Sequence, residues 1–165
     1  MKKIIIILFA FMAIVLLSNK TDEVIIPKSS IRYRIIANSN DKDDQILKLK
    51  INEDVLPIII KSINEVNNID EAKTSIKNSI PNIKKILDNY NVDYQINYGN
   101  NYFPQKKYKN VLYEQGNYES LVISLDKAKG DNFWCVLFPP LCLIDTNNEN
   151  VEYESYVKKI INKYK

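Results

Sequence analysis

The sequence predicts an α/β fold: a two-layer single domain in which a mostly antiparallel sheet packs against helices, preceded by an N-terminal signal or anchor segment. Apolar residues recur at helical spacing between residues 43 and 90, and from residue 92 onwards they alternate as in half-buried strands. The order is one strand, helices, several strands and a terminal helix, which is typical of a sheet covered by helices. A length of 165 residues fits one domain and a short leader.

Residues 1–17 have the features of an export signal. Lys2 and Lys3 precede an apolar run from Ile4 to Leu17, as a positively charged n-region precedes the h-region of a secretory signal. The run is shorter than the roughly 20 residues that a membrane-spanning helix needs. Because Ser18 and its neighbours offer no Ala-x-Ala cleavage site, a cleaved signal peptide and a retained membrane anchor both stay open. In either case the domain is expected outside the cytoplasm.

The remaining sequence is divided into a tether and a folded domain. Residues 18–30 are polar and then mixed, which predicts a tether, and residues 31–165 are expected to form the single domain. Without the leader, residues 1–17, the chain holds 21 basic and 20 acidic residues, a net charge of +1. Nucleic-acid-binding domains instead show a clustered basic surface, so no nucleic-acid partner is expected.

The first half of the domain is predicted to be one strand followed by helices. Residues 31–37 alternate in the manner of a strand. After a polar turn at residues 38–41, an amphipathic helix is predicted from residue 43 to residue 56. Pro57 is expected to end or kink this helix, because proline lacks the backbone N–H of an interior position.

A second helical block is predicted after residues 58–66, which continue the first helix beyond its proline. Asp70 is a candidate N-cap, and apolar residues at helical spacing extend the block to Tyr90. Pro81 interrupts the block, so two helices and one bent helix are both open.

The second half of the domain is predicted to be rich in strands. Alternating patterns indicate strands at residues 92–98, 102–108 and 119–125. Gly99-Asn100 is a turn signal between the first two. Pro104 favours an edge position for the second strand, because proline cannot donate a ladder hydrogen bond.

The stretch from Gly130 to Cys142 contains the only tryptophan and both cysteines of the chain. Residues 133–138 are an unbroken apolar run, which predicts a buried strand. Pro139-Pro140 is expected to end this strand and to form a corner. A second short strand or extended segment is predicted at residues 141–144, and a terminal helix at residues 151–164.

Cys135 and Cys142 lie on either side of this corner and are a candidate disulfide. A bond between them would close a loop of about eight residues, which the chain-entropy model values at roughly 2.5 kcal/mol. A nucleophilic Cys135 is the less favoured alternative. Histidine is absent and no cation lies beside this cysteine in the sequence, so nothing indicates a lowered thiol pKa.

The absence of histidine excludes several classes of enzyme. Ser-His-Asp and Cys-His nucleophile systems and His-bearing zinc sites cannot be built, and two cysteines are too few for an all-cysteine zinc site. No Gly-rich phosphate loop is present, and no cofactor is expected. A carboxylate-dependent extracytoplasmic hydrolase, acting on cell wall through Asp131, Asp145 or Glu119, stays open as the alternative function. Asp131 is the best placed of the three, although aspartate is also a common turn residue.

Arg32 and Arg34 are the only arginines of the chain, which has 23 basic residues in total. They lie two positions apart and therefore on the same face of the predicted strand. Where any cation would serve, this composition supplies lysine. We therefore infer that a planar, bidentate guanidinium is needed here. An internal ion pair with helix carboxylates and a role in partner binding are equally open.

Several stretches of the chain resemble the stage II sporulation protein R family. The likeness extends from about residue 31 to residue 145, and the run that contains the tryptophan and both cysteines is its most specific part. The matching stretches are Ile31–Asn40, Asp44–Lys50, Tyr98-Gly99, Phe103-Pro104, Gly116–Leu121 and Gly130–Cys142.

The resemblance implies a signalling protein of endospore-forming bacteria. Members of the family are made in the forespore and cross its inner membrane. In the space between forespore and mother cell they trigger a membrane-embedded aspartic-type protease, which then cleaves the precursor of sigma-E. The expected function is activation of this protease by binding, not by catalysis. The chain would be secreted, or attached to the membrane through an uncleaved N-terminal segment.

The resemblance implies no catalytic residues. Contacts with the protease are expected on the two arginines and on the loops at residues 38–41, 99–104 and 130–132. The candidate contact residues are Arg32, Arg34, Asn38, Ser39, Tyr102, Phe103, Asp131 and Asn132.

Overall fold

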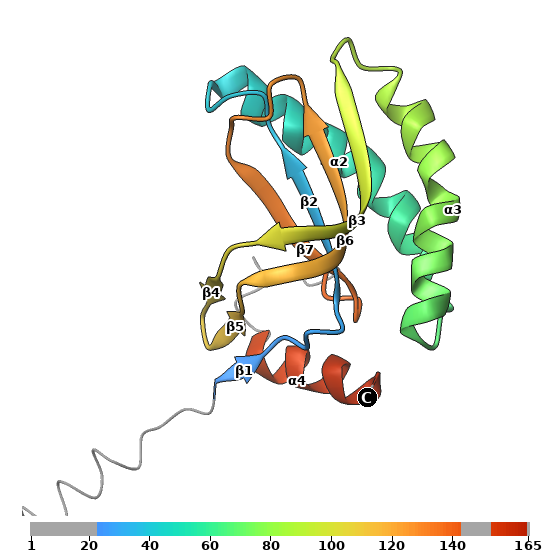
Figure 1. The fold of residues 1–165 in the computed structure, drawn as a ribbon, viewed down its shortest axis with the longest axis vertical. Coiled ribbons are helices and arrows are strands. Elements are labelled where there is room, and N and C mark those ends of the chain that lie inside the picture. Colours follow the sequence, from blue (N-terminus) through green and yellow to red (C-terminus); the bar gives the residue numbers. More distant parts are fainter. Residues whose placement is uncertain (1–22, 143–152, 165) are drawn as a thin grey trace, which may run out of the picture.

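The computed structural model describes residues 23–142 and 153–164, and within them it contains two sheets and three helices (Figure 1). Helices α2 and α3 lie side by side against the large sheet, and α4 lies at the other end of the molecule beside β1. The predicted α/β domain is confirmed. The elements are β1 (Val24–Ile25), β2 (Ile31–Ile36), α2 (Lys42–Ile63), α3 (Ile69–Leu87), β3 (Tyr94–Phe103), β4 (Lys106–Tyr108), β5 (Val111–Tyr113), β6 (Gly116–Leu125), β7 (Asn132–Phe138) and α4 (Tyr153–Lys163).

The large sheet has the strand order β3-β6-β2-β7. β3 and β6 are antiparallel, β6 and β2 are parallel, and β2 and β7 are antiparallel, so the sheet is mostly antiparallel as predicted. A parallel pair needs a long crossover connection, and here β2 is joined to β6 through α2, α3, β3, β4 and β5. The register places Arg32 level with Ser120 and Val136, and it places Arg34 level with Val122 and Trp134.

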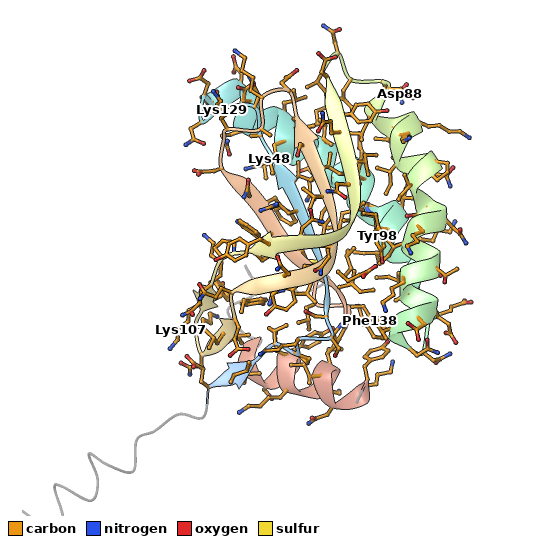
Figure 2. All side chains as sticks on the ribbon, in the orientation of Figure 1. Lys48, Asp88, Tyr98, Lys107, Lys129 and Phe138 are labelled. Carbon is orange, nitrogen blue, oxygen red and sulfur yellow. A yellow bond between two sulfur atoms is a disulfide. The ribbon has the colours of Figure 1, made fainter. Side chains whose placement is uncertain are left out.

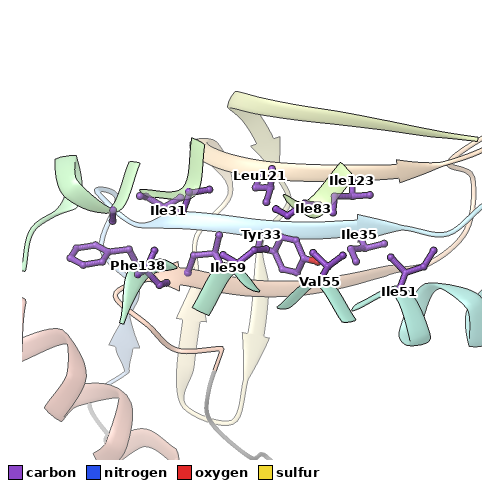
Figure 3. Packing of buried hydrophobic residues seen from close by; sticks show 14 of the residues in the cluster. Ile31, Tyr33, Ile35, Ile51, Val55, Ile59, Ile83, Leu121, Ile123 and Phe138 are labelled. Carbon is purple, nitrogen blue, oxygen red and sulfur yellow. The ribbon is translucent and has the colours of Figure 1, made fainter. Parts of the chain in front are cut away.

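One face of the large sheet forms the main hydrophobic core under α2 and α3. Ile31, Tyr33 and Ile35 of β2 are completely buried there, as the alternation predicts. Full burial of such a side chain contributes roughly 1.5–3 kcal/mol. Figure 3 shows these residues packed against others from β6, α2, α3 and β7, including Leu121, Ile123, Ile51, Val55, Ile59, Ile83 and Phe138.

Both helices of the core continue through a proline. Pro57 lies inside α2 and Pro81 inside α3, so α2 does not end at Pro57, its predicted continuation beyond the proline is confirmed, and the second block is one helix. An interior proline costs about 3 kcal/mol in an isolated helix. Val55 and Ile59, which flank Pro57, are completely buried. Packing on both sides of the proline therefore outweighs the lost backbone hydrogen bond.

The N-cap of α3 is Asn68 rather than the predicted Asp70. Its side-chain oxygen accepts hydrogen bonds from the backbone N–H groups of Asp70 (3.1 Å) and Glu71 (2.9 Å). The Asn68 side-chain amide in turn donates to the Glu71 carboxylate (2.7 Å). Asn68 and Glu71 therefore exchange two hydrogen bonds, which makes Asn68 a better N-cap than Asp70.

The predicted turn at Gly99-Asn100 is wrong. β3 continues through both residues as a ten-residue strand, and Gly99 lies level with Ser120 of β6. Figure 1 shows that β3 and β6 bend together. The ladder with β6 along the whole strand outweighs the local turn preference. The predicted strand at residues 102–108 is therefore divided between β3 and β4.

Residues 24–30, predicted as part of the tether, belong to the folded domain. Val24 of β1 pairs with Val111 of β5, and the side chain of Ile26 is completely buried. Val24 and Ile26 form a second, smaller core with five other residues, and this packing explains why the segment belongs to the domain. These are Val111, Val136, Leu141, Val157 and Ile161.

The N-terminal signal or anchor prediction, residues 1–17, lies outside the described residues. Among the residues that the structure describes, no helix has both the length and the apolar content needed to cross a bilayer. The predicted terminal helix is confirmed as α4, with Val157 and Ile161 facing the smaller core.

The corner after β7 has the predicted form. β7 ends at Phe138, and the Phe138–Pro139 peptide bond is cis. Cys135 and Cys142 are joined by a disulfide with their Cα atoms 5.5 Å apart, which confirms the candidate pair. Residues 143–144 of the predicted second short strand lie outside the described part of the chain.

Candidate functional site

The face of the large sheet that points away from α2 and α3 carries alternating cationic and aromatic side chains. The Arg32 guanidinium carbon lies 3.4 Å from the ring centroid of Tyr118 and 5.5 Å from that of Phe103. The Arg34 guanidinium carbon lies 5.0 Å from Phe103 and 5.2 Å from Trp134. Nζ of Lys106 lies 5.5 Å from the Trp134 ring. We refer to these six residues as the cation–aromatic stack: Tyr118, Arg32, Phe103, Arg34, Trp134 and Lys106.

The stack is assembled by strand geometry. Side chains two positions apart on a strand share a face and are separated by about 6.6 Å, so Arg32 and Arg34 leave room for one ring between them. Phe103 of β3 supplies this ring, and it also makes edge contacts with Trp134 (centroids 5.4 Å apart) and Tyr118 (6.2 Å). Five strands therefore contribute to one continuous row of side chains.

The two arginines have no anionic partner within the described residues. Arg32 is 2 % exposed, and its Nε and Nη2 atoms, like Nε of Arg34, are buried without a hydrogen-bond partner. The ion pairs that the structure shows involve other residues. The arginines point away from the helices, so the alternative of an internal ion pair with helix carboxylates is wrong for the described part of the chain.

The stack keeps its positive charge at physiological pH. Burial lowers the pKa of Arg32, and electrostatic interactions with Tyr118, Tyr113 and Glu114 oppose this shift. Burial also lowers the pKa of Arg34. An ordinary arginine pKa is above about 12, so both groups stay protonated.

A cavity of about 390 Å³ lies beside the stack. Arg32, Phe103 and Trp134 of the stack line it, together with the disulfide between Cys135 and Cys142. Strand β4 forms another side of the cavity, and Figure 2 shows Lys107 on this strand at the edge of the molecule.

The contact candidates Asn38 and Ser39 lie at the far end of β2, where they hold the N-terminus of α2. Asn38 Nδ2 and Ser39 Oγ both donate hydrogen bonds to Asp44 Oδ2, at 2.9 and 2.6 Å. A Cβ atom added to Gly130 would lie 2.1 Å from the Ser39 carbonyl oxygen, so only glycine fits there. This tight junction is structural, and partner contact by its residues stays a prediction.

The candidates Asp131 and Asn132 belong to the same junction. The Asp131 N–H donates to Asn40 Oδ1 (2.6 Å), and the Asp131 carbonyl accepts from Lys48 Nζ (3.0 Å). Asn132 begins β7 and lies level with Ile36. Two further candidates, Tyr102 and Phe103, end β3: Tyr102 is 56 % exposed, whereas Phe103 is buried in the stack.

The stack unites three predicted candidates, Arg32, Arg34 and Phe103, with three residues that sequence reasoning missed. These are Tyr118, Trp134 and Lys106. The alternation of β7 could have placed Trp134 on one face of a strand. It could not have indicated that β2 is the neighbouring strand.

Among the described residues, the two carboxylates of the alternative hydrolase, Asp131 and Glu119, do not come together. Asp131 directly precedes Asn132 of β7. The sheet register places Asn132 level with Ile36 of β2, and Ile36 level with Ser124 of β6. Glu119 lies five residues before Ser124 on β6, about 16 Å along a strand, whereas paired glycosidase carboxylates are about 5–9.5 Å apart. Asp145 lies outside the described residues. Within the described residues no group of three His, Cys, Asp or Glu side chains could hold a metal ion.

The comparisons with known proteins agree with the resemblance seen in the sequence. Residues 27–148 match the family model of Stage II sporulation protein R, a range that includes the whole stack and both cysteines. The chain is 37 % identical over 136 residues to "Stage II sporulation protein R" of Bacillus subtilis (strain 168). That alignment covers 79 % of this chain and 61 % of the relative, so the chain spans about three fifths of the relative's length. No solved structure matches. The chain therefore belongs to the stage II sporulation protein R family.

Proposed function

We propose that this chain is an extracytoplasmic signalling protein of endospore formation that activates the membrane-embedded protease cleaving the sigma-E precursor. Family membership supports the role in sporulation. The cation–aromatic stack supports action by binding, because it presents three cations that have no anionic partner among the described residues. This stack is the observation on which the binding mechanism rests.

The arrangement of the stack is better suited to a partner than to stability. Each cation–aromatic contact contributes about 0.5–2 kcal/mol, but desolvating a charge without a counter-ion costs several kcal/mol. A chain with 23 basic residues places its only two arginines here. Sites that reduce stability in this way are commonly retained for function.

The leader and the disulfide support an extracytoplasmic location for the domain. The lysines and apolar run of residues 1–17 favour export. Disulfides such as Cys135–Cys142 persist in oxidising compartments outside the cytoplasm. With the role that the family resemblance implies, we propose that the domain acts in the space between forespore and mother cell, secreted or anchored through its N-terminal segment.

Activation by binding sets a thermodynamic requirement. A ligand shifts a protein between two states only by its difference in affinity for them. Changing the protease from 1 % to 99 % active requires about 10⁴-fold tighter binding to the active state. The domain achieves this either by contacting a surface that only the active protease has or by bridging two protease chains.

Reconstitution tests the function directly. The full chain, or a form lacking residues 1–17, is expressed with the protease and the sigma-E precursor in a host that contains none of them. We expect precursor cleavage with the exported form and none with the form that stays in the cytoplasm. Absence of cleavage by exported, folded protein would contradict the proposed function.

A double variant tests the role of the guanidinium groups. Arg32→Lys with Arg34→Lys keeps both charges but removes the planar, bidentate donors, and we expect precursor cleavage to fall at least ten-fold. The matched control is Lys84→Ala with Lys85→Ala, two exposed positions on α3, which lies on the other face of the sheet. Full cleavage with a folded Arg-to-Lys variant would show that any cation suffices.

A further inference from the structure

The cavity beside Arg32 has walls that suit an apolar group. Its volume of about 390 Å³ is at the lower end of the range for ligand sites, about 300–1,000 Å³. Phe103, Trp134 and Leu141 line it together with the disulfide of Cys135 and Cys142. A space of this size and chemistry fits one or two amino-acid side chains.

Arg32 supplies a buried guanidinium group to the cavity. It lines the cavity and is 2 % exposed, and its Nε and Nη2 atoms have no hydrogen-bond partner among the described residues. The rings of Tyr118 and Phe103 lie over the faces of the guanidinium and leave its N–H edge without an acceptor. A buried donor without an acceptor costs about 1–3 kcal/mol. An incoming oxygen that accepts from this edge would remove that cost.

The charges around the cavity select an anion. Lys106 and Lys107 line it together with Arg32, and none of the described residues that line it is acidic. Lys107 already has a partner, since its Nζ lies 2.7 Å from Glu23 Oε1. Among the described residues, the one partner of Lys106 is the Trp134 ring, at 5.5 Å. Two cations therefore have no carboxylate partner among the described residues.

The anion best matched to this site is a carboxylate on an apolar segment. A guanidinium edge binds a planar carboxylate through two parallel hydrogen bonds, and the surrounding rings favour an apolar neighbour. Tyr108 and Tyr113 also line the cavity, and Tyr108 is 40 % exposed. This aromatic, partly exposed lining favours a protein segment over a small molecule, because aromatic residues are enriched at protein interfaces.

We propose that this cavity receives an aspartate or glutamate side chain of a partner protein, with an aromatic or aliphatic neighbour of that residue in its apolar part. The proposal rests on the proposed function and names the chemistry that the partner brings. The carboxylate accepts hydrogen bonds from Arg32 and lies close to Lys106. The apolar neighbour displaces water from Phe103, Trp134 and the disulfide.

Trp134, the only tryptophan of the chain, reports on the cavity that it lines. The purified full chain is titrated with the capped peptide acetyl-Phe-Glu-Phe-amide and with its uncharged isostere acetyl-Phe-Gln-Phe-amide, and tryptophan fluorescence is followed. We expect a saturable change with the glutamate peptide and at least ten-fold weaker binding of the glutamine peptide. Equal affinities, or no saturable change with the glutamate peptide, would overturn the proposal.

A variant pair assigns the effect to Arg32. Arg32→Met is expected to reduce the affinity for the glutamate peptide to that for the glutamine peptide. Lys129→Met is the matched control, because Lys129 is exposed and lies far from Lys107 and the cavity (Figure 2). An unchanged preference for glutamate in Arg32→Met would overturn the proposal. If that variant does not fold, the two peptides still decide the question with the unmodified chain.

The titration separates this inference from protease activation, because it needs neither the protease nor the sigma precursor. If the glutamate peptide does not bind but reconstitution succeeds, the carboxylate proposal is wrong and protease activation is still supported. If the glutamate peptide binds but reconstitution fails, the protease-activation proposal is wrong and the carboxylate site is still supported. Fluorescence changes with phosphatidylglycerol vesicles but not with the glutamate peptide would overturn the proposal in favour of a lipid surface.

Discussion

The two faces of the large sheet come from the same strands but have opposite chemistry. On the face toward α2 and α3, Ile31, Tyr33 and Ile35 of β2 are completely buried in apolar surroundings. On the opposite face, Arg32 and Arg34 of the same strand lie among aromatic rings without a carboxylate partner in the described residues. One strand therefore serves both the core and the candidate binding site.

The difference shows how stability and function are separated at alternate positions. The helix-facing side chains are buried without polar groups, apart from the hydroxyl of Tyr33, and each contributes roughly 1.5–3 kcal/mol. The stack holds its cations by ring contacts that are individually weaker. A change on the first face should therefore reduce the free energy of unfolding, and a change on the second should alter binding.

The largest expected effect contrasts two neighbouring isoleucines of β2. Ile35→Ala removes a completely buried side chain from the core and is expected to lower the free energy of unfolding by about 3 kcal/mol. Ile36→Ala makes the same chemical change on the opposite, partly exposed face and should cost less than about 1 kcal/mol. Urea unfolding measures both. Equal losses would show that the two faces are covered to the same extent.

Much of the helix-facing side could be predicted from the sequence, because it depends on local patterns. The alternation of residues 31–37 placed three side chains in the core, and the apolar run before Pro139-Pro140 predicted β7 and its end. The errors arose where tertiary contacts outweigh local preference. α2 does not end at Pro57, because buried side chains flank the proline, and Gly99 lies inside a strand, because β3 pairs with β6 before and after this residue.

The stack could be predicted only in part. The scarcity of arginine made Arg32 and Arg34 stand out, since composition alone would have supplied lysine. Their aromatic neighbours come from other strands, and those pairings join residues far apart in the sequence, such as Arg32 with Ser120 and with Val136. No local pattern contains that register. The sequence therefore indicated which cations matter but not which rings surround them.

A smaller effect, of opposite sign, is expected from Arg32→Met. The substitution removes two buried donor nitrogens, Nε and Nη2, that lack acceptors among the described residues, each of which costs about 1–3 kcal/mol. It also removes the contact with Tyr118, which is worth about 0.5–2 kcal/mol. We expect the free energy of unfolding to rise by about 1 kcal/mol while precursor cleavage is lost. A loss of stability above 1 kcal/mol would instead make Arg32 a structural residue and weaken the contrast between the faces.

The last effect at neutral pH is expected from Tyr33→Phe, which removes a single buried hydroxyl that has no hydrogen-bond partner among the described residues and should raise the free energy of unfolding by about 1 kcal/mol. Its consequence appears at alkaline pH. Burial raises the pKa of Tyr33 well above its ordinary value, so above pH 10 the unfolded chain releases this proton while the folded chain keeps it. Stability is then present below pH 10 and falls by about 1.4 kcal/mol per pH unit above it. Urea unfolding of both proteins between pH 9 and about 11 should show a shallower decline for Tyr33→Phe. Identical declines would mean that water reaches this hydroxyl, and that the helix-covered face is more open than its burial indicates.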